Sequence, residues 1–179
     1  MKGILAGIGL TLLVELIVAY GLVERGLIPA NADAAPSSLE TWMARTSLRA
    51  TIRREAPSEA NPVPLTEQNL SDGLHLFAQN CAICHGSAKG NASPSPIAKG
   101  LYQKPPQFAS EGVEDDPEGE SYWKIKHGIR FTGMPSFAAT LSDREIWSLA
   151  LFLKHMDKLP PPVQDVWRQV ENWPPNRCQ

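Results

Sequence analysis

Cysteine, net charge and strand-like patterns are all scarce in this sequence. Only three of its 179 residues are cysteine, too few for a disulfide framework. The 17 basic and 19 acidic residues leave a net charge of −2, so we expect no bulk binding to nucleic acid. No segment alternates apolar and polar residues as a half-buried strand does. These absences favour an all-α protein that is not held together by disulfides.

Proline, by contrast, is abundant. Its 16 copies exceed average usage and gather at residues 57–64, 94–106 and 160–175. A good part of the chain is therefore expected to be extended connection. The remaining length leaves room for one ordinary domain with additional segments.

The amino-terminal stretch has the length of a membrane span. Residues 4–23 carry one charge, Glu15, and as a helix they would reach about 30 Å, the thickness of a bilayer core. The alternative is a cleaved signal peptide, because residues 30–32 (Ala-Asn-Ala) resemble a cleavage site. The apolar run exceeds a usual signal core and the site lies far past it, so we expect a retained transmembrane anchor over residues 1–24.

Two features of this span suggest helical neighbours. Gly3 and Gly7 form a small-xxx-small pair that lets another backbone approach. Glu15 lies near mid-membrane, where a carboxylate is unfavourable unless it is protonated, paired or facing protein. A lone anchor with a neutral Glu15 is the alternative.

A basic helix is expected soon after the span. Residues 39–55 read as a helix that ends before a proline, with Ser38 as its N-cap. Arg45, Arg49 and Arg53 recur at four-residue steps and therefore form one stripe. Such a stripe is usually a solvated face. Docking on anionic headgroups or on an acidic partner is the second interpretation.

The central motif of the chain is Cys81-Ala82-Ile83-Cys84-His85. Two cysteines two residues apart, followed at once by histidine, are the signature of covalent c-type haem attachment. Each thiol can form a thioether with one vinyl group, and His85 can then donate an imidazole nitrogen to the iron. A structural zinc site would need four ligands, and the only other cysteine, Cys178, stands alone. We therefore predict one covalent haem c.

A helix is expected to run into this motif, with Thr66 or Ser71 as its N-cap. Gly73, Phe77 and Cys81 follow at four-residue steps and share one face. The glycine allows another helix to approach closely, and the phenylalanine would fill the contact.

The expected partner is the last strong helix. Residues 142–145 (Ser-Asp-Arg-Glu) form a capping box. The helix then repeats apolar residues at helical spacing: Ile146, Leu149, Leu153 and Met156. Between the two helices we predict a shorter one over residues 120–127, closed by Gly128 as its C-cap.

A methionine in a loop is the candidate for the second axial ligand. Met134 lies between Gly133 and Pro135, and its thioether is a soft ligand suited to the open position of a haem iron. The alternative is a buried methionine that fills a gap. His127 is the serious rival ligand, and the lesser rivals are His75, His155 and Met156.

These residues together resemble class I, monohaem cytochrome c over about residues 67–159. The resemblance rests on the helix into the motif, the Cys-x-x-Cys-His motif, the Gly-Met-Pro loop and the terminal helix with Leu149 and Phe152. It implies an all-α wrap around one haem, with His85 as the proximal ligand and Met134 as the distal one. It also implies that a proline carbonyl, from Pro94 or Pro96, accepts a bond from the second nitrogen of the histidine.

A narrower resemblance concerns residues 97–108, which are similar to membrane-anchored bacterial monohaem cytochromes. Such proteins often serve dehydrogenases, quinol-oxidising complexes, oxidases or photosynthetic reaction centres. Since c-type haem is attached outside the cytoplasm in proteins of this kind, the resemblance places residues 25–179 on the periplasmic side of the inner membrane.

The expected organisation has four parts. An anchor over residues 1–24 precedes a linker with the arginine helix over 25–65, the cytochrome c domain over 66–160 and a tail over 161–179. The tail carries an apolar stripe that either folds back on the domain or binds another subunit: Val163, Val166, Trp167, Val170 and Trp173. Cys178 is expected to be a free thiol or part of an intermolecular disulfide.

The predicted function is one-electron transfer without catalysis, as the haem subunit of a larger respiratory, dehydrogenase-linked or photosynthetic membrane complex. Predicted partners are lipid, redox donor and acceptor proteins, and other subunits that contact the span, the arginine helix and the tail. A free-standing tethered shuttle is one alternative, in which the proline-rich residues 56–65 let the haem domain swing. A haem sensor or peroxidase is the other, and it would need an open iron site.

Overall fold

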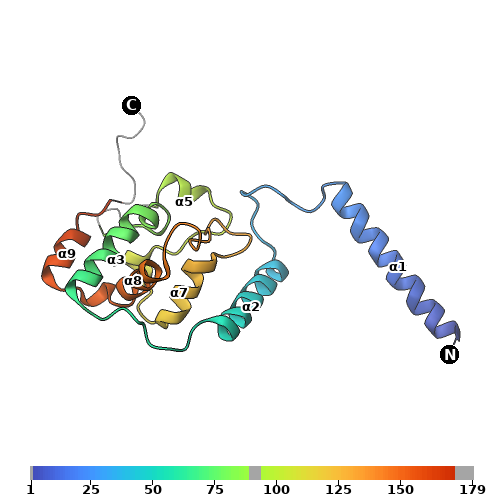
Figure 1. The fold of residues 1–179 in the computed structure, drawn as a ribbon. Coiled ribbons are helices and arrows are strands. Elements are labelled where there is room, and N and C mark those ends of the chain that lie inside the picture. The colour runs from blue at the N-terminus through green and yellow to red at the C-terminus, as the bar shows by residue number, and fades with distance from the viewer. Residues whose placement is uncertain (1, 89–93, 172–179) are drawn as a thin grey trace. The chain divides into compact units, whose positions relative to one another are not determined.

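The computed structural model describes residues 2–88 and 94–171 of the chain. It divides the chain into two compact units, Met1–Ala35 and Pro36–Gln179. The described residues contain helices and no strand, which confirms the all-α prediction (Figure 1). The helices are α1 (Lys2–Glu24), α2 (Ser38–Glu55), α3 (Glu67–Asn80), α4 (Ala82–His85), α5 (Pro96–Gly100), α6 (Phe108–Glu111), α7 (Glu118–His127), α8 (Asp143–Lys154) and α9 (Pro161–Trp167), with a 3₁₀ turn at Met156–Lys158.

The first unit consists of α1 and the short segment after it. Among the described residues, α1 is the one helix long and apolar enough to cross a membrane. None of its residues is buried within the protein. The apolar helix expected at the amino terminus is therefore present, and its length matches the hydrocarbon thickness of a bilayer.

The second unit is built on the crossing of α3 and α8. Gly73 lies so close to α8 that a Cβ there would overlap the Ser148 carbonyl and the Cβ of Phe152. The rings of Phe77 and Phe152 meet with centroids 5.6 Å apart, and both side chains are fully buried. The predicted pairing of the Gly73/Phe77 face with the last strong helix is thus confirmed.

Local capping sets where these helices begin. Thr66 caps α3 by accepting a bond from the Asn69 amide (3.2 Å). Ser142 and Glu145 form the predicted capping box of α8. One prediction was displaced by one residue, because Ser37, not Ser38, caps α2. Ser37 has the extended backbone that an N-cap requires, whereas Ser38 is already helical.

Residues 56–65, the spacer on which the alternative of a swinging shuttle relied, pack on α7 and α8. A Cβ at Gly119 would overlap the Pro57 carbonyl. The Asn61 amide donates to Glu118 Oε1 and to the Trp147 carbonyl, both at 3.1 Å. Val63 is buried in the core. Proline content indicated an extended segment correctly, but it did not reveal that the segment lies against the domain.

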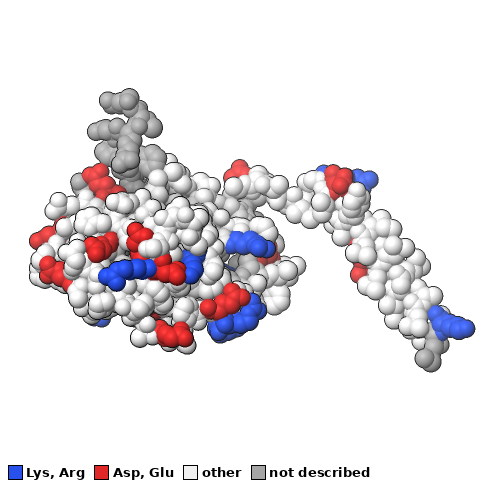
Figure 2. Space-filling model, in the orientation of Figure 1, with Lys and Arg blue, Asp and Glu red and all other residues white. Residues whose placement is uncertain are grey.

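Helix α2 belongs to the same packed unit. Ile52 is buried, and α2 lies against α7. At its other end, Glu40 accepts a bond from the Tyr102 hydroxyl (2.5 Å). The arginines of α2 remain on the surface, and Figure 2 shows basic side chains over the region where α2 lies.

The tail folds back on the domain as far as the structure describes it. Val163 and Trp167 of α9 are buried. The Trp167 ring meets Phe77 and Phe152 edge-on, with centroids 5.6 Å apart in each case. Of the remaining predicted stripe, Val166 is exposed and Val170 is partly buried against the core. Trp173 and Cys178 lie outside the described residues.

Candidate functional site

The Cys-x-x-Cys-His motif occupies one tight helical turn. Helix α3 ends at Asn80 with Cys81 as its C-cap, and α4 follows at once. The amides of Cys84 and His85 both donate to the Cys81 carbonyl, at 3.0 and 2.9 Å. Gly86 closes the turn with a φ of 77°, a conformation that favours glycine. Both thiols and the imidazole are thereby presented from a single turn at the end of a core helix.

Burial affects the acidity of both thiols of the motif. Burial raises the pKa of Cys81 to about 12, and the neighbouring Cys84 adds to this effect. Burial also raises the pKa of Cys84. Both groups are therefore protonated thiols at neutral pH. Within residues 2–88 and 94–171, no group of three or more His, Cys, Asp or Glu side chains could hold a metal ion.

The His85 ring is held from two sides. Its Nδ1 atom lies 3.0 Å from the Pro106 carbonyl oxygen, and since a carbonyl only accepts, Nδ1 is the donor. In the neutral ring this leaves Nε2 with its lone pair. The ring also stacks on Phe108, with centroids 4.4 Å apart and planes 9° from parallel. Burial lowers the pKa of His85, which favours the neutral form that can bind iron.

The supporting carbonyl was predicted to come from Pro94 or Pro96, and both predictions were wrong. Pro94 is exposed and Pro96 begins α5. The supporting residue is Pro106, which the Gln107 side chain helps to place by donating to the carbonyls of Cys84 (2.9 Å) and Pro105 (3.0 Å). The Pro105-Pro106 pair was a visible signal of a fixed extended segment, but sequence alone did not show that it returns to the motif.

The loop that carries Met134 is fixed on both sides of that residue. The Met134 amide donates to Thr132 Oγ1 (3.1 Å), and its carbonyl accepts from the Ile129 amide (3.1 Å). The Phe137 amide donates to the Ile125 carbonyl at 3.2 Å, which attaches the loop to α7. Met134 is partly buried and packs against the same hydrophobic core as Cys81.

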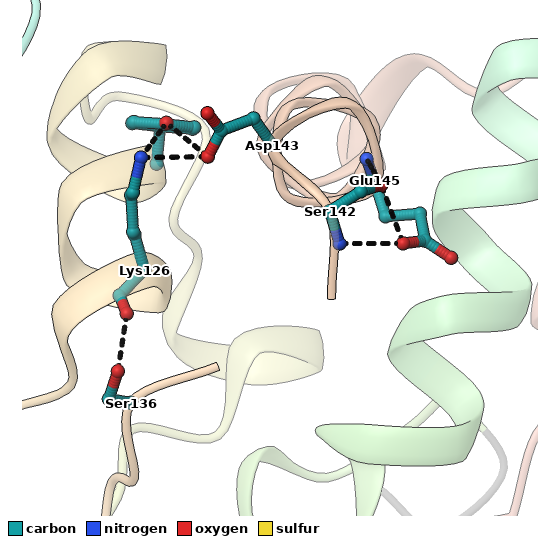
Figure 3. A network of polar contacts seen from close by, with 6 residues as sticks. Lys126, Ser136, Ser142, Asp143 and Glu145 are labelled. Atoms are coloured by element: carbon teal, nitrogen blue, oxygen red, sulfur yellow. Dashed lines mark hydrogen bonds and ion pairs between the residues drawn. The ribbon is translucent and has the colours of Figure 1, made fainter. Parts of the chain in front are cut away.

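A polar network connects this loop to two helices (Figure 3). Ser136 donates to the Lys126 carbonyl at 2.7 Å. Lys126 Nζ donates to Asp143 Oδ1 (2.7 Å) and to the Tyr122 hydroxyl (2.8 Å), and that hydroxyl donates to Asp143 at 2.9 Å. The Lys126 ammonium, with help from Tyr122, holds the pKa of Asp143 below its ordinary value. No sequence pattern revealed this network, since it joins residues from three separate segments.

One segment touches both halves of the candidate site. Pro106 contacts His85, and five residues earlier Leu101 lies so close to Gly133 that a Cβ there would overlap its side chain. Gly133 immediately precedes Met134. The segment 101–107 therefore supports both predicted axial residues, although His85 and Met134 are far apart in the sequence.

The rival ligands have other roles in the structure. His127 is exposed, with its ring centroid 5.1 Å from that of Trp123. His75 is exposed, and its Nδ1 donates to the Ser71 carbonyl at 2.7 Å. His155 Nδ1 donates to the Leu151 carbonyl at 2.9 Å, and Met156 is buried beside it. The local surroundings of these four residues therefore explain their positions without a role as an iron ligand.

Comparison with known proteins gave one family match. Residues 68–153 match the family described as cytochrome c oxidase, cbb3-type, subunit III. The comparison with curated proteins found no match. A solved structure titled Kuenenia stuttgartiensis reducing HAO-like protein complex Kustc0457/Kustc0458 is 29% identical over 54% of this chain, with a TM-score of 0.42. The alignment covers 48% of that chain, so the present chain spans about half of its length.

Proposed function

Residues 68–153 form a c-type cytochrome domain that carries covalent haem c, and on this premise we propose that the chain is a membrane-anchored one-electron carrier. The function that the domain implies is haem-based electron transfer, in which the iron supplies a one-electron redox couple. A carrier of this kind needs residues that hold the haem, a defined place at the membrane and redox partners.

Cys81 and Cys84 are proposed to form the two thioether bonds, with His85 and Met134 as axial ligands. The Pro106 carbonyl accepts the hydrogen bond from Nδ1 and thereby orients the imidazole ring. Nε2, on the other side of the ring, is then the nitrogen proposed to bind the iron. Thr132 and the Leu101 contact fix the position of the Met134 loop. With both axial positions filled, no site remains for a substrate, which favours electron transfer over catalysis.

The observation that carries this proposal is the double contact of the segment 101–107, to His85 through Pro106 and to the Met134 loop through Leu101. Its test is the variant Met134→Ala in the haem-loaded full chain. We expect the reduced wild type to resist carbon monoxide and the variant to bind it rapidly, because a ligand has been removed from the iron. The reduction potential should also fall, since methionine ligation raises it.

Met156→Ala is the matched control, because it removes a buried methionine from the same domain. This control should be less stable but should still resist carbon monoxide. Rapid binding of carbon monoxide by the wild type would contradict the proposal and favour a haem sensor or peroxidase. Resistance in Met134→Ala combined with sensitivity in His127→Ala would assign the ligand to His127 instead.

The domain is proposed to lie on the periplasmic side of the inner membrane, with α1 as its anchor. The length and hydropathy of α1 support a membrane span. The side is argued from the haem motif, because c-type haem is attached outside the cytoplasm in bacterial proteins that this chain resembles. Protease added to intact spheroplasts should digest the haem domain, and a reporter fused before Lys2 should stay protected.

The chain is also proposed to work as a subunit of a larger redox complex. Gly3, Gly7 and Glu15 on α1 support helix–helix contacts within the membrane. The packing of residues 57–63 on the haem domain disfavours a freely swinging shuttle. In mild detergent the chain should purify with other membrane proteins. Recovery as a lone monomer would support the shuttle instead.

A further inference from the structure

The outward face of α2 has an unusual composition. The opposite side of this helix is used for packing: Ile52 is buried, and Thr41 and Leu48 are half-buried. At about 100° per residue, three large apolar side chains are turned away from that contact, and three exposed arginines lie between them and the packed side. These are Leu39, Trp42 and Met43, exposed by 65, 63 and 56%, and the exposed Arg45, Arg49 and Arg53.

The arginines and the apolar residues lie side by side on this face. Arg45, Arg49 and Arg53 fall within an arc of about 80° that borders the apolar trio. No carboxylate in the described part of the chain lies within ion-pair distance of these three arginines. The two acidic residues of the helix are engaged elsewhere, Glu40 with Tyr102 and Glu55 with Arg54. The face therefore offers positive charge and apolar surface together.

This combination is typical of a helix that lies in a membrane interface. Apolar and aromatic side chains enter the boundary between headgroups and acyl chains, while arginines beside them bind lipid phosphates. The short connection between α1 and α2 keeps α2 near any membrane that α1 enters. Residues 25–37 separate α1 from α2, and fully extended they would span at most about 45 Å. A membrane that holds α1 is therefore always within reach of α2.

We propose that the face of α2 formed by Leu39, Trp42, Met43, Arg45, Arg49 and Arg53 docks on an anionic lipid surface, that of the membrane which α1 enters. The inference rests on the proposed anchoring by α1. Because α2 lies against α7 and its Ile52 is buried, docking would hold the whole haem domain in one orientation to the membrane. An acidic protein subunit on the same face is the competing occupant, and the test separates the two.

The experiment uses the haem-loaded full chain carrying Cys178→Ser and Met43→Cys, reconstituted into vesicles. The alkylation rate of the introduced thiol by a water-soluble maleimide is compared between detergent, phosphatidylcholine vesicles and vesicles that also contain phosphatidylglycerol. We expect the rate to fall about tenfold in the anionic vesicles and to recover as salt is added. Gln169→Cys, at an exposed position after α9, should react equally fast in all three.

Two charge variants complete the test. R45Q/R49Q/R53Q should abolish protection of the thiol at position 43 in anionic vesicles. R130Q/R144Q/R168Q removes the same charge from other parts of the domain and should leave the protection intact. Equal alkylation in detergent and in anionic vesicles would overturn the proposal. So would protection that persists in detergent and ignores salt, which would identify a protein subunit as the occupant.

The haem spectrum and carbonate extraction are measured on the same samples. A normal spectrum and resistance to extraction, combined with a fully reactive thiol, would refute the docking while leaving the proposed function in place. If carbonate releases the chain, α1 is not an anchor, and the docking inference falls with it.

Discussion

At the scale of single residues, the contact between Gly73 and α8 decides how close the two core helices can come. A Cβ at this position would overlap the Ser148 carbonyl. This carbonyl belongs to the backbone, so a change of side-chain rotamer cannot relieve the overlap. Gly73→Ala should therefore destabilise the domain by about 1–3 kcal/mol. The measurement is a denaturant titration followed by far-UV circular dichroism.

Gly100→Ala is the matched control for this prediction. Gly100 lies at the exposed end of α5, and a Cβ there would meet nothing within 4 Å. Alanine in a helix also restricts the unfolded chain, so stability should be unchanged or slightly increased. An equal loss from both substitutions would show that α3 and α8 do not depend on a close approach at Gly73.

The support of His85 shows which residue-level features a sequence can predict. The spacing of Cys81, Cys84 and His85 is local, and one turn of helix is enough to present all three. The accepting carbonyl comes from Pro106, 21 residues later. Its position depends on a chain reversal that is held by the Gln107 amide, a long-range contact. Proximity in sequence favoured Pro94 and Pro96, and that criterion carries no information about such a reversal.

At the scale of elements, the network of Lys126, Tyr122 and Asp143 couples α7 to the start of α8. The pKa of Asp143 is held below its ordinary value of 3.8, mainly by the bond from Lys126 and then by that from Tyr122. Its contribution to stability is therefore fully present above pH 3.8 and is lost as the pH falls through the lowered value. The pKa of Lys126 is raised above 10.5, so its contribution is present below pH 10.5 and is lost above it.

We therefore predict that Asp143→Asn is less stable than the wild type between about pH 4 and pH 10. The difference should shrink at acid pH, because the wild type itself then loses the charged carboxylate. Unfolding midpoints measured at several pH values would show this convergence. Asp157→Asn is the control, because Asp157 pairs with its sequence neighbour Lys158 on the surface and connects no two helices of the network. A constant difference down to the lowest pH would argue against the network.

The helices themselves were largely predictable, because their signals are local. Capping residues such as Thr66, the capping box at Ser142 and the C-cap at Gly128 each act within one turn. The packing of the segment after α2 was not predictable in this way. Pro57 and Asn61 meet Gly119 and Trp147, residues about 60 and 90 positions away, and a proline-rich composition fits a free linker equally well.

At the scale of the whole molecule, the main question is whether the haem domain moves as one body with α2. The buried Ile52 and the Pro57–Gly119 contact argue that it does. Under the proposed anchoring by α1, the domain would change its position only through the residues before α2. Under the same proposal, this would restrict the distance that an electron can be carried by motion alone and would favour partners close to the membrane.

Trypsin gives a direct test of this rigid attachment, since Arg53 and Arg54 are exposed cleavage sites on α2. Protease needs local unfolding to cut within a helix, so the wild type should be cleaved slowly here. Ile52→Asn buries an amide in the α2–α7 contact and should weaken it by about 2–3 kcal/mol, which raises cleavage at Arg53 and Arg54 by at least about tenfold.

Ala50→Asn makes a comparable change at an exposed position of the same helix and should have little effect. If both variants are cut as slowly as the wild type, the α2–α7 contact does not hold the helix. If the wild type is already cut rapidly, α2 is detached in solution and the domain is free to swing.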